Sequence, residues 1–489
     1  RDGLVYVARR PRNTANCGEY LRRLAQGLAH DVSLVQAKSI LGLRRSGADW
    51  PFIIGEISQF GSRNHDRWGE GMTLLAIAAN LLPELRPETA YQLVLRAGRQ
   101  VGADCSDAPA RREREPLADA THSPERLTRW LRAWVRARHR DAGERVLLTA
   151  IARLETPAAL AELVFTAAGD RIYAQIGHVF DGWNKAFELL DLVGWKHASA
   201  VLPLVIAPTV SARGAEEDAH WHHPQELIEP LRAAETELPA LLRTGSSRSC
   251  DGAGDLLPVL LGDDPLAIIE VLKQKLAGGV SAQVLAQRVA YAAAVRLARF
   301  STNNEVADWF NPRHTFIFAC AVHQAVKRSP APGIVRGVFH AALAVYMDRF
   351  LNVPPARFAG DPRKLGALPT DIEGLRHGLL SCLDQQSNVD EAALIVARWL
   401  RVGQPYSELV DLLAHATVRE DLDFHALQVL EAAVRQCRDW GPGRECELIM
   451  IAVVRQLAAF CPTPRAAHRI ATTALRLERG DKMYEETPG

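Results

Sequence analysis

The chain has 489 residues, of which 48% are hydrophobic and 24% charged, and its net charge is +1. This composition is typical of a globular protein with a large core, and the charge balance argues against nucleic-acid binding, for which a basic surplus is expected. No signal-like segment or uninterrupted apolar run of about 18 residues is present, so we expect no membrane span and a cytoplasmic location. None of the eight cysteines forms a CxxC pair, which argues against a zinc knuckle or an iron–sulfur motif. The oligomeric state is left open.

Apolar residues recur at helical spacing along the N-terminal half of the chain. Leu21, Leu24 and Leu28 mark a first amphipathic helix. Further helices are predicted at about 72–82, 87–103, 125–139, 142–153, 156–169 and 172–193. The polar, proline-containing stretch 104–124 is predicted to be a linker or long surface loop.

The same periodicity continues after a Gly/Ser-rich loop at 244–256. We therefore divide the chain into an N-terminal helical half, residues 1–243, and a C-terminal helical half, residues 257–479, followed by a polar tail at 480–489. Helices in the second half are predicted at about 265–276, 281–300, 314–327 and 335–351, with four or five more beyond. Alternating β patterns are absent, so the sequence predicts an all-α protein, a large multi-helix bundle or array with no significant sheet.

The helix predicted at 172–193 carries polar residues on one face within apolar surroundings. His178, Asp181, Lys185 and Glu188 are spaced i, i+3, i+7 and i+10, so they share a face. The flanking aromatic and aliphatic residues indicate burial. Buried titratable groups must be paired or must bind something. On this pattern alone a structural polar network is the commoner outcome, and a functional site is the alternative.

Common catalytic motifs are absent from the sequence. The chain contains no P-loop, no GxGxxG in a βαβ unit, no HExxH, no GxSxG and no EF-hand loop. An all-α chain without them has three remaining routes to function: a metal or haem site between helices, an apolar ligand pocket, or an interaction surface.

Histidines give the best functional lead. Of sixteen, we single out His178, His314, His340 and the cluster 220–223, which contains three histidines and a tryptophan. A lone buried histidine is more often bonded to a carbonyl than to a metal, but four in separate segments favour convergence. Imidazole suits Fe, Zn, Cu or Ni. The others, including His425, lie among polar residues or at helix ends and receive little weight.

Four short blocks carry a resemblance to a known family. They are GHVFDGWNKAFE at 177–188, EEDAHWHHP at 216–224, ARFSTNNE at 298–305 and HTFIFACAVHQA at 314–325. In this order they resemble the questin oxidase-like family, in particular bacterial helical proteins in which this domain often precedes a Rieske domain. The resemblance covers roughly residues 50–355.

The resemblance implies an all-helical, non-haem iron oxygenase or oxidase that uses O2 on an aromatic polyketide, such as an anthraquinone, or a related phenolic substrate. It implies metal ligands at His178, His223, His314 and His340. A carboxylated lysine is also implied, with Lys185 as the candidate and Lys196 as the alternative. Asp181 or Glu188 would orient a ligand histidine or act as a catalytic base.

Two departures from the family pattern support a second hypothesis. Gln100 and Ser301 stand where we expect histidines in the relatives, and neither is a good iron ligand. No Cys/His pair has Rieske spacing, so a reductase would be a separate protein or unnecessary. The second hypothesis is a non-catalytic, degenerate relative without a metal, which serves as a helical partner- or ligand-binding subunit.

Overall fold

The computed structural model describes residues 14–480, except 107, 119–121, 155, 249–251 and 387. Throughout the described part the regular secondary structure is helical, and no strand occurs in it. The prediction of an all-α, multi-helix protein is therefore confirmed. Residues 481–489, which hold nearly all of the predicted tail, lie outside the described part.

The first half of the chain forms twelve α-helices and six short 3-10 helices within the described residues. They are α1 Thr14–Ala29, α2 Ser33–Arg45, α3 Trp50–Asn64, α4 Glu70–Leu81, η1 Leu82–Glu84, α5 Pro87–Cys105, α6 Pro124–Arg136, α7 Arg140–Arg153, α8 Pro157–Ala168, η2 Ala174–Gly177, α9 His178–Val193, η3 Trp195–His197, α10 Ala198–Val201, η4 Leu202–Val205, α11 Ile206–Ser211, η5 Ala215–Glu217, η6 Ala219–Trp221 and α12 Ile228–Ser246.

The second half of the chain is also helical in its described residues. Its elements are α13 Leu257–Leu260, α14 Pro265–Ala277, α15 Ala282–Ala298, η7 Val306–Trp309, α16 Phe310–Arg328, α17 Pro332–Met347, η8 Asp348–Leu351, α18 Pro362–Gly366, α19 Ile372–Leu383, α20 Val389–Arg401, α21 Tyr406–Arg419, α22 Phe424–Trp440, α23 Arg444–Phe460 and α24 Ala466–Glu478.

Helix starts follow local capping chemistry. The side chains of Ser123, Thr156, Asp264 and Ser281 each accept a hydrogen bond from a backbone N–H in the first turn of the next helix. Such caps satisfy donors that have no partner within the helix. They account for the close agreement between predicted and observed boundaries at α6, α8, α14 and α15.

The helix predicted at 172–193 begins later, at His178. Tyr173, Gln175 and Ile176 have positive φ angles of 46°, 51° and 50°, and Gly177, the N-cap, has φ 91°. Left-handed residues cannot continue a right-handed helix. The chain therefore turns sharply before α9, and this turn places His178 at the first position of the helix.

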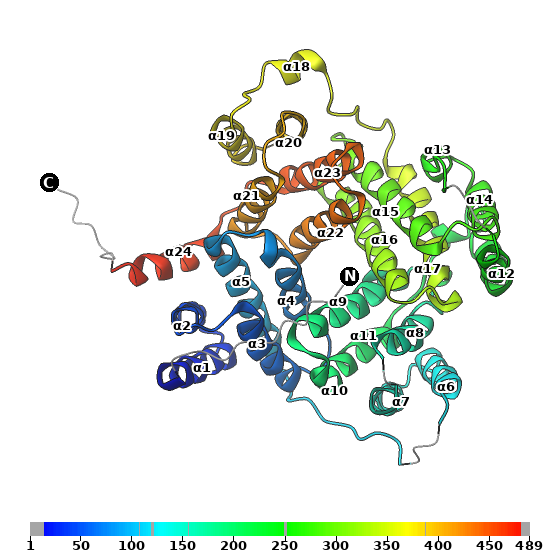
Figure 1. Ribbon diagram of the computed structural model, residues 1–489, viewed down its shortest axis with the longest axis horizontal. Helices are drawn as coiled ribbons and strands as arrows, with labels where there is room; N and C mark the ends of the chain where they lie inside the picture. Colours follow the sequence, from blue (N-terminus) through cyan, green and yellow to red (C-terminus); the bar gives the residue numbers. More distant parts are fainter. Residues whose placement is uncertain are drawn as a thin grey trace.

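Four helices form the centre of the molecule. Helix α4 packs against α9 and α22, and α16 packs against α9 and α22. These helices come from both sides of the predicted linker, and they meet near the middle of Figure 1. A cluster of histidines joins α9, α16 and α22 near their first turns. A network of hydrogen bonds and ion pairs joins α4, α9 and α22 in their later turns. The four helices therefore run in the same direction, with their N-terminal ends together.

The first and last helices of the described part also lie side by side. Helix α24 packs against α2 and α5, and α21 packs against α5, so the last helices lie beside the first ones (Figure 1).

The loop predicted at 244–256, between the two halves of the chain, is helical up to Ser246 in α12, and α13 begins at Leu257. Residues 249–251 within it lie outside the described part.

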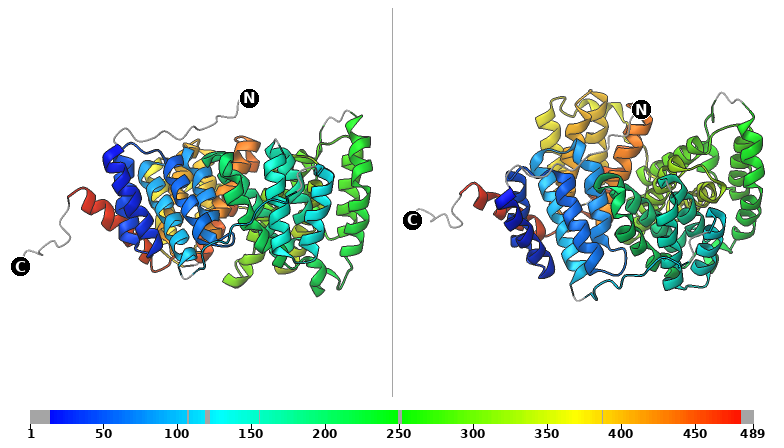
Figure 2. Two further views of the ribbon diagram at one scale, coloured as in Figure 1. Left: turned by 90° about the horizontal axis from the view of Figure 1, so that it is seen from below. Right: turned by 60° about the horizontal axis from the view of Figure 1, so that its bottom comes forward.

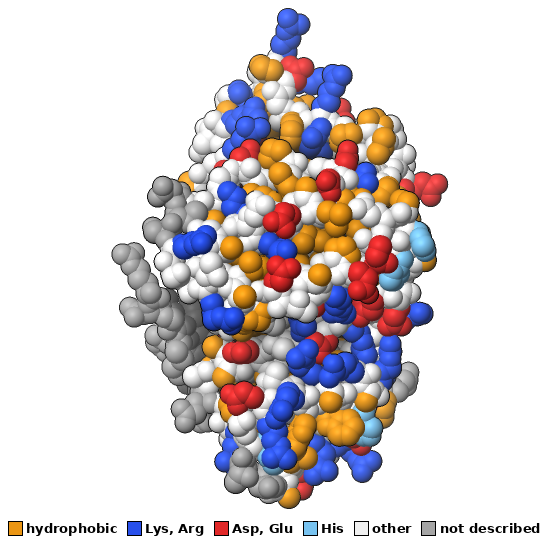
Figure 3. Space-filling model, turned by 90° about the vertical axis from the view of Figure 1, so that its right-hand side faces the viewer, with side chains coloured by type: hydrophobic (Ala, Val, Ile, Leu, Met, Phe, Trp, Pro, Cys, Tyr) orange, Lys and Arg blue, Asp and Glu red, His pale blue; other side chains and the backbone are white. Residues whose placement is uncertain are grey.

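Surface and burial show how the remaining segments are arranged. Seen from below in Figure 2, many helices stand side by side across the short dimension of the molecule. Basic and acidic side chains are interspersed over the face shown in Figure 3, in keeping with the balanced net charge.

By length and composition alone, Trp195–Glu217 is apolar enough to cross a membrane, but 67% of its most apolar window is buried within the fold.

Candidate metal centre

Three histidines from distant parts of the chain converge at the N-terminal end of the central bundle. They are His178 on α9, His314 on α16 and His425 on α22, and one ring nitrogen from each lies within 4.8 Å of the other two. The Nε2 atom of His425 is 3.0 Å from Nε2 of His314 and 3.4 Å from Nε2 of His178. His314 and His425 are buried, and His178 is partly exposed.

In two of these rings the nitrogen that points away from the cluster, Nδ1, faces an acceptor. Nδ1 of His314 is hydrogen-bonded to the carbonyl oxygen of Phe310, one turn earlier on α16. Nδ1 of His425 lies 3.5 Å from a carboxylate oxygen of Asp423. A carbonyl oxygen can only accept, so Nδ1 of His314 carries the proton and its Nε2 presents a lone pair.

While His425 is neutral, no assignment of its single ring proton satisfies every contact in this cluster. If His425 is protonated at Nδ1, two Nε2 lone pairs face each other at 3.0 Å. If it is protonated at Nε2 instead, its Nδ1 lone pair faces the Asp423 carboxylate. A cation between the three Nε2 atoms removes both conflicts. Metal-bound histidines commonly hold their second nitrogen against a carbonyl or carboxylate in this way.

Burial keeps the three imidazoles neutral. Burial, with a smaller contribution from the neighbouring His425, lowers the pKa of His178 to about 4 and that of His314 to about 3. Burial also lowers the pKa of His425, although Asp423 opposes this shift. Neutral imidazole is the form that binds a metal ion. The donor set therefore fits a transition metal such as iron or zinc.

A second layer of residues surrounds the three rings. Arg313 is buried and pairs with Asp423 at 2.5 Å. Burial raises the pKa of Asp423, but its bonds to His425 and Arg313 outweigh this and hold the pKa well below its usual range. Phe310 stacks on His314, and Phe424 lies against His178 and His425. Asp423 is thus an ionised carboxylate, 37% exposed, at the edge of the cluster.

The structure does not bring His340 or His223 into this cluster. His340 lies on α17, where its Nε2 is 2.7 Å from a carboxylate oxygen of Glu235 on α12. That pairing accounts for an imidazole in an apolar helix without a metal. His223 lines a separate cavity that also contains Tyr173 and Trp221. The predicted convergence of four histidines therefore holds for His178 and His314 only.

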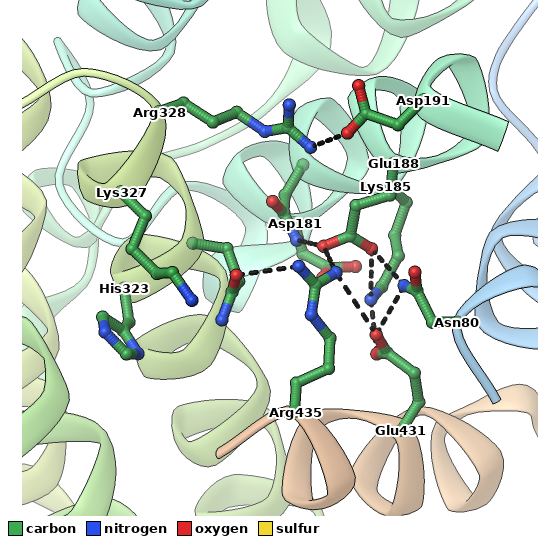
Figure 4. Close-up of polar contacts among 12 residues, drawn as sticks. Asn80, Asp181, Lys185, Glu188, Asp191, His323, Lys327, Arg328, Glu431 and Arg435 are labelled. Atoms are coloured by element: carbon green, nitrogen blue, oxygen red, sulfur yellow. Dashed lines mark hydrogen bonds and ion pairs between the residues drawn. The ribbon is translucent and has the colours of Figure 1, made fainter. Parts of the chain in front are cut away.

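Lys185 belongs to a buried ion-pair network two turns further along α9 (Figure 4). Its Nζ donates to Glu188 at 3.0 Å and to Glu431 of α22 at 2.5 Å. Burial lowers the pKa of Lys185, but the carboxylates of Glu188 and Glu431 more than reverse this, so the net shift is upward. A carbamate requires a neutral amine, and these surroundings favour the charged ammonium. The expectation of a carboxylated lysine at this position therefore lacks support.

Glu188 is fully engaged in the same network. It accepts hydrogen bonds from Arg435, Asn80 and Asn184 in addition to Lys185 (Figure 4). Burial raises its pKa, yet Arg435 and Lys185 bring it below the usual range. A carboxylate with every lone pair occupied is a poor catalytic base. Glu188 therefore has a structural role.

Asp181 lies between the histidines and this network. It follows His178 by one turn of α9 and accepts a hydrogen bond from Gln428, which follows His425 by one turn of α22. Burial, together with the charges of Glu188 and Glu431, raises the pKa of Asp181 to about 7. Asp181 can therefore hold or release a proton near neutral pH.

The two residues that argued for a degenerate relative have hydrogen-bond partners other than the three histidines. Gln100 on α5 donates to Asp104 at 2.9 Å. The backbone N–H of Ser301 donates to Asn352 at 3.1 Å. Neither residue occupies a ligand position next to His178, His314 or His425.

No protein-family model, curated protein or solved structure matches the chain. The observed fold and cluster themselves define the class: an all-α protein in which histidines of three parallel helices form a site that could hold a metal ion.

Proposed function

We propose that the chain is a histidine-ligated metal enzyme, and specifically a non-haem iron oxygenase or oxidase that acts on an aromatic, phenolic substrate. The observation that carries the metal is the approach of three neutral Nε2 atoms, two of them with acceptors behind their rings. The resemblance of the four sequence blocks to the questin oxidase-like family supports iron and the phenolic substrate class.

In this proposal His178, His314 and His425 hold the metal. Three protein ligands leave coordination positions open, as in catalytic rather than structural metal sites. When bound, iron supplies the chemistry of O2 activation. Phe310 and Phe424 exclude water beside the rings, and Asp423 fixes the orientation of His425. Asp181 holds a proton one turn below His178.

The first test is the metal content of the purified protein. Protein expressed in iron-supplemented medium and purified without chelator should contain close to one equivalent of a transition metal. The variants His314→Ala and His425→Ala should contain less than about a tenth of an equivalent.

His340→Ala provides the matched control. It also removes a buried histidine with a hydrogen-bonded partner, but its partner is Glu235 and it lies outside the cluster. Its metal content should equal that of the wild type. A wild-type protein without metal, or equal metal in all four proteins, would overturn the proposal and favour a non-catalytic helical subunit.

A further inference from the structure

A large cavity lies on the other side of the segments that carry His178 and His314. Its volume is about 970 Å³, at the upper end of the range for small-molecule sites. Its wall is formed by the turn before α9, the first turns of α16, the end of α17, η8 and the segment that contains η5 and η6. None of the three clustered histidines lines it.

The cavity has a largely apolar and aromatic wall. Tyr173, Trp221 and Met347 contribute buried or partly buried surface, and Ile176 and Phe350 are 46% and 48% exposed. Both side chains line the cavity, so they form an exposed apolar part of its wall. A ring-containing molecule would bury both of them.

One carboxyl group in the wall has an unmet hydrogen-bonding requirement. Asp348 at the start of η8 is only 5% exposed, and its Oδ2 has no hydrogen-bond partner among the described residues. Burial raises the pKa of Asp348 to about 7, although the Thr315 hydroxyl and the charge of Arg296 oppose this shift. A buried polar atom without a partner is costly, and most such atoms in proteins are satisfied.

The other charged groups of the wall are already paired. Glu217 accepts from Arg213 and Arg138, and Asp218 accepts from His220. These pairs are partly exposed and lie toward the solvent. Asp348 is thus distinguished from the other carboxylates in the wall by a buried oxygen that has no hydrogen-bond partner among the described residues.

The backbone beside the cavity is strained. Tyr173, Gln175 and Ile176 all have positive φ, within four residues of one another, and none of them is glycine. Such residues cost free energy, and they cluster at active sites and ligand sites. The strain turns Tyr173 and Ile176 into the cavity wall. This observation is independent of the Asp348 carboxyl group.

We propose that this cavity binds a small, ring-containing apolar molecule that donates a hydrogen bond from a hydroxyl or ammonium group to Oδ2 of Asp348. The aromatic wall would contact the ring, and the exposed Ile176 and Phe350 would close over its outer edge. The inference does not depend on the metal proposal, since neither the cavity wall nor Asp348 belongs to the histidine cluster.

The test uses three naphthalene probes of similar size. They are 1-naphthalenemethanol, 1-naphthylmethylamine and 1-naphthoate, which offer a hydroxyl, an ammonium and a carboxylate. Binding is measured by calorimetric titration of the full chain. The alcohol or the amine, or both, should bind at least tenfold more tightly than the carboxylate, because only they can donate to Asp348.

Two variants assign this preference to the carboxyl group. Asp348→Leu should weaken the preferred probe by roughly ten- to a hundredfold, the range for a hydrogen bond to a charged group. Asp348→Asn keeps the shape and should weaken the amine more than the alcohol, so it replaces the leucine variant if that one does not fold. Asp263→Asn, an exposed carboxylate nearby in the fold, is the control and should bind as the wild type does.

Three results would overturn the inference: no binding of the alcohol or the amine at their solubility limits, equal binding of the carboxylate, or unchanged binding by both Asp348 variants. None of these readouts involves metal content. A failure here therefore leaves the metal proposal standing, and a failure of the metal proposal leaves this one standing.

Discussion

The Nε2 atoms of His314 and His425 lie 3.0 Å apart, although 111 positions separate the two residues in the chain. Nδ1 of His314 donates to the carbonyl of Phe310, so its Nε2 presents a lone pair. Nδ1 of His425 lies 3.5 Å from the carboxylate of Asp423, and when that nitrogen carries the ring proton the Nε2 of His425 presents a lone pair as well. Two lone pairs at this distance repel unless a proton or a cation lies between them. This relationship is the basis of the metal proposal, and several predictions test it and its surroundings.

Asp423→Asn should weaken metal binding without abolishing it. The amide keeps the size of the side chain but loses the charge that orients His425, and loss of such a partner typically costs about 10–100-fold in affinity. Competition with a chromophoric chelator measures the change. Asp439→Asn, which removes a carboxylate paired with Lys327, is the control. Equal affinities in both variants would show that Asp423 does not support the site.

Metal removal should lower thermal stability only when the three histidines are intact. A ligand that binds only the native state stabilises it by RT ln(1 + L/Kd), where L is the free ligand concentration. Dialysis against a chelator should therefore lower the Tm of the wild type by several degrees, and addition of ferrous iron under anaerobic conditions should restore it. The Tm of His425→Ala should not respond. A chelator effect of the same size in that variant would place the metal elsewhere.

Lys185→Met should be strongly destabilising. Removal of one partner of a buried ion pair costs about 3–5 kcal/mol, because Glu188 and Glu431 would remain buried with less compensation. Lys327→Met is the matched control, since Lys327 pairs with Asp439 at 2.7 Å but is 32% exposed, and such pairs contribute about 1 kcal/mol or less. Urea denaturation gives both values. Similar costs would mean that the buried network adds little.

The free energy of unfolding should depend on pH through Asp181. Its pKa is raised from 3.8 to about 7 on folding, so the folded state holds the proton more tightly than the unfolded state. This contribution is complete below pH 4 and is lost as the pH rises to 7, by up to about 1.4 kcal/mol per pH unit. Asp181→Asn cannot titrate, so the wild type should lose stability relative to it across this window.

Urea unfolding at pH 4, 5, 6 and 7 measures this difference. Asp348 has a similarly raised pKa, but it is present in both proteins and cancels in the comparison. Asp191→Asn alters an exposed carboxylate on the same helix and should remain parallel to the wild type. A constant difference between wild type and Asp181→Asn would mean that Asp181 stays ionised in the folded protein.

The helices were predictable because their signals are local. Caps such as Ser123 and Asp264 and the regular spacing of apolar residues fix most boundaries within a few residues. The start of α9 was not predictable, since nothing in the sequence before Gly177 marks the positive φ angles of Tyr173, Gln175 and Ile176. The burial of Asp181, Lys185 and Glu188 followed from their apolar neighbours and was confirmed.

The pairing of the site residues depends on tertiary contacts that one sequence does not reveal. The sequence gives His425 little weight as a metal ligand, because it follows Asp421 and Asp423 and this context resembles an exposed helix start. The available signal was the Asp-Phe-His spacing, which places a carboxylate near an imidazole at the first turn of a helix. His340 stood out in its apolar helix, but its partner Glu235 lies 105 positions earlier.

The most direct test of the central claim is anomalous X-ray diffraction from crystals of the metal-loaded protein, measured above and below the iron absorption edge. The account predicts a single strong anomalous peak about 2.0–2.2 Å from the ring nitrogens of His178, His314 and His425. A peak at any other position, or none between these three rings in protein that contains a full equivalent of iron, would contradict it.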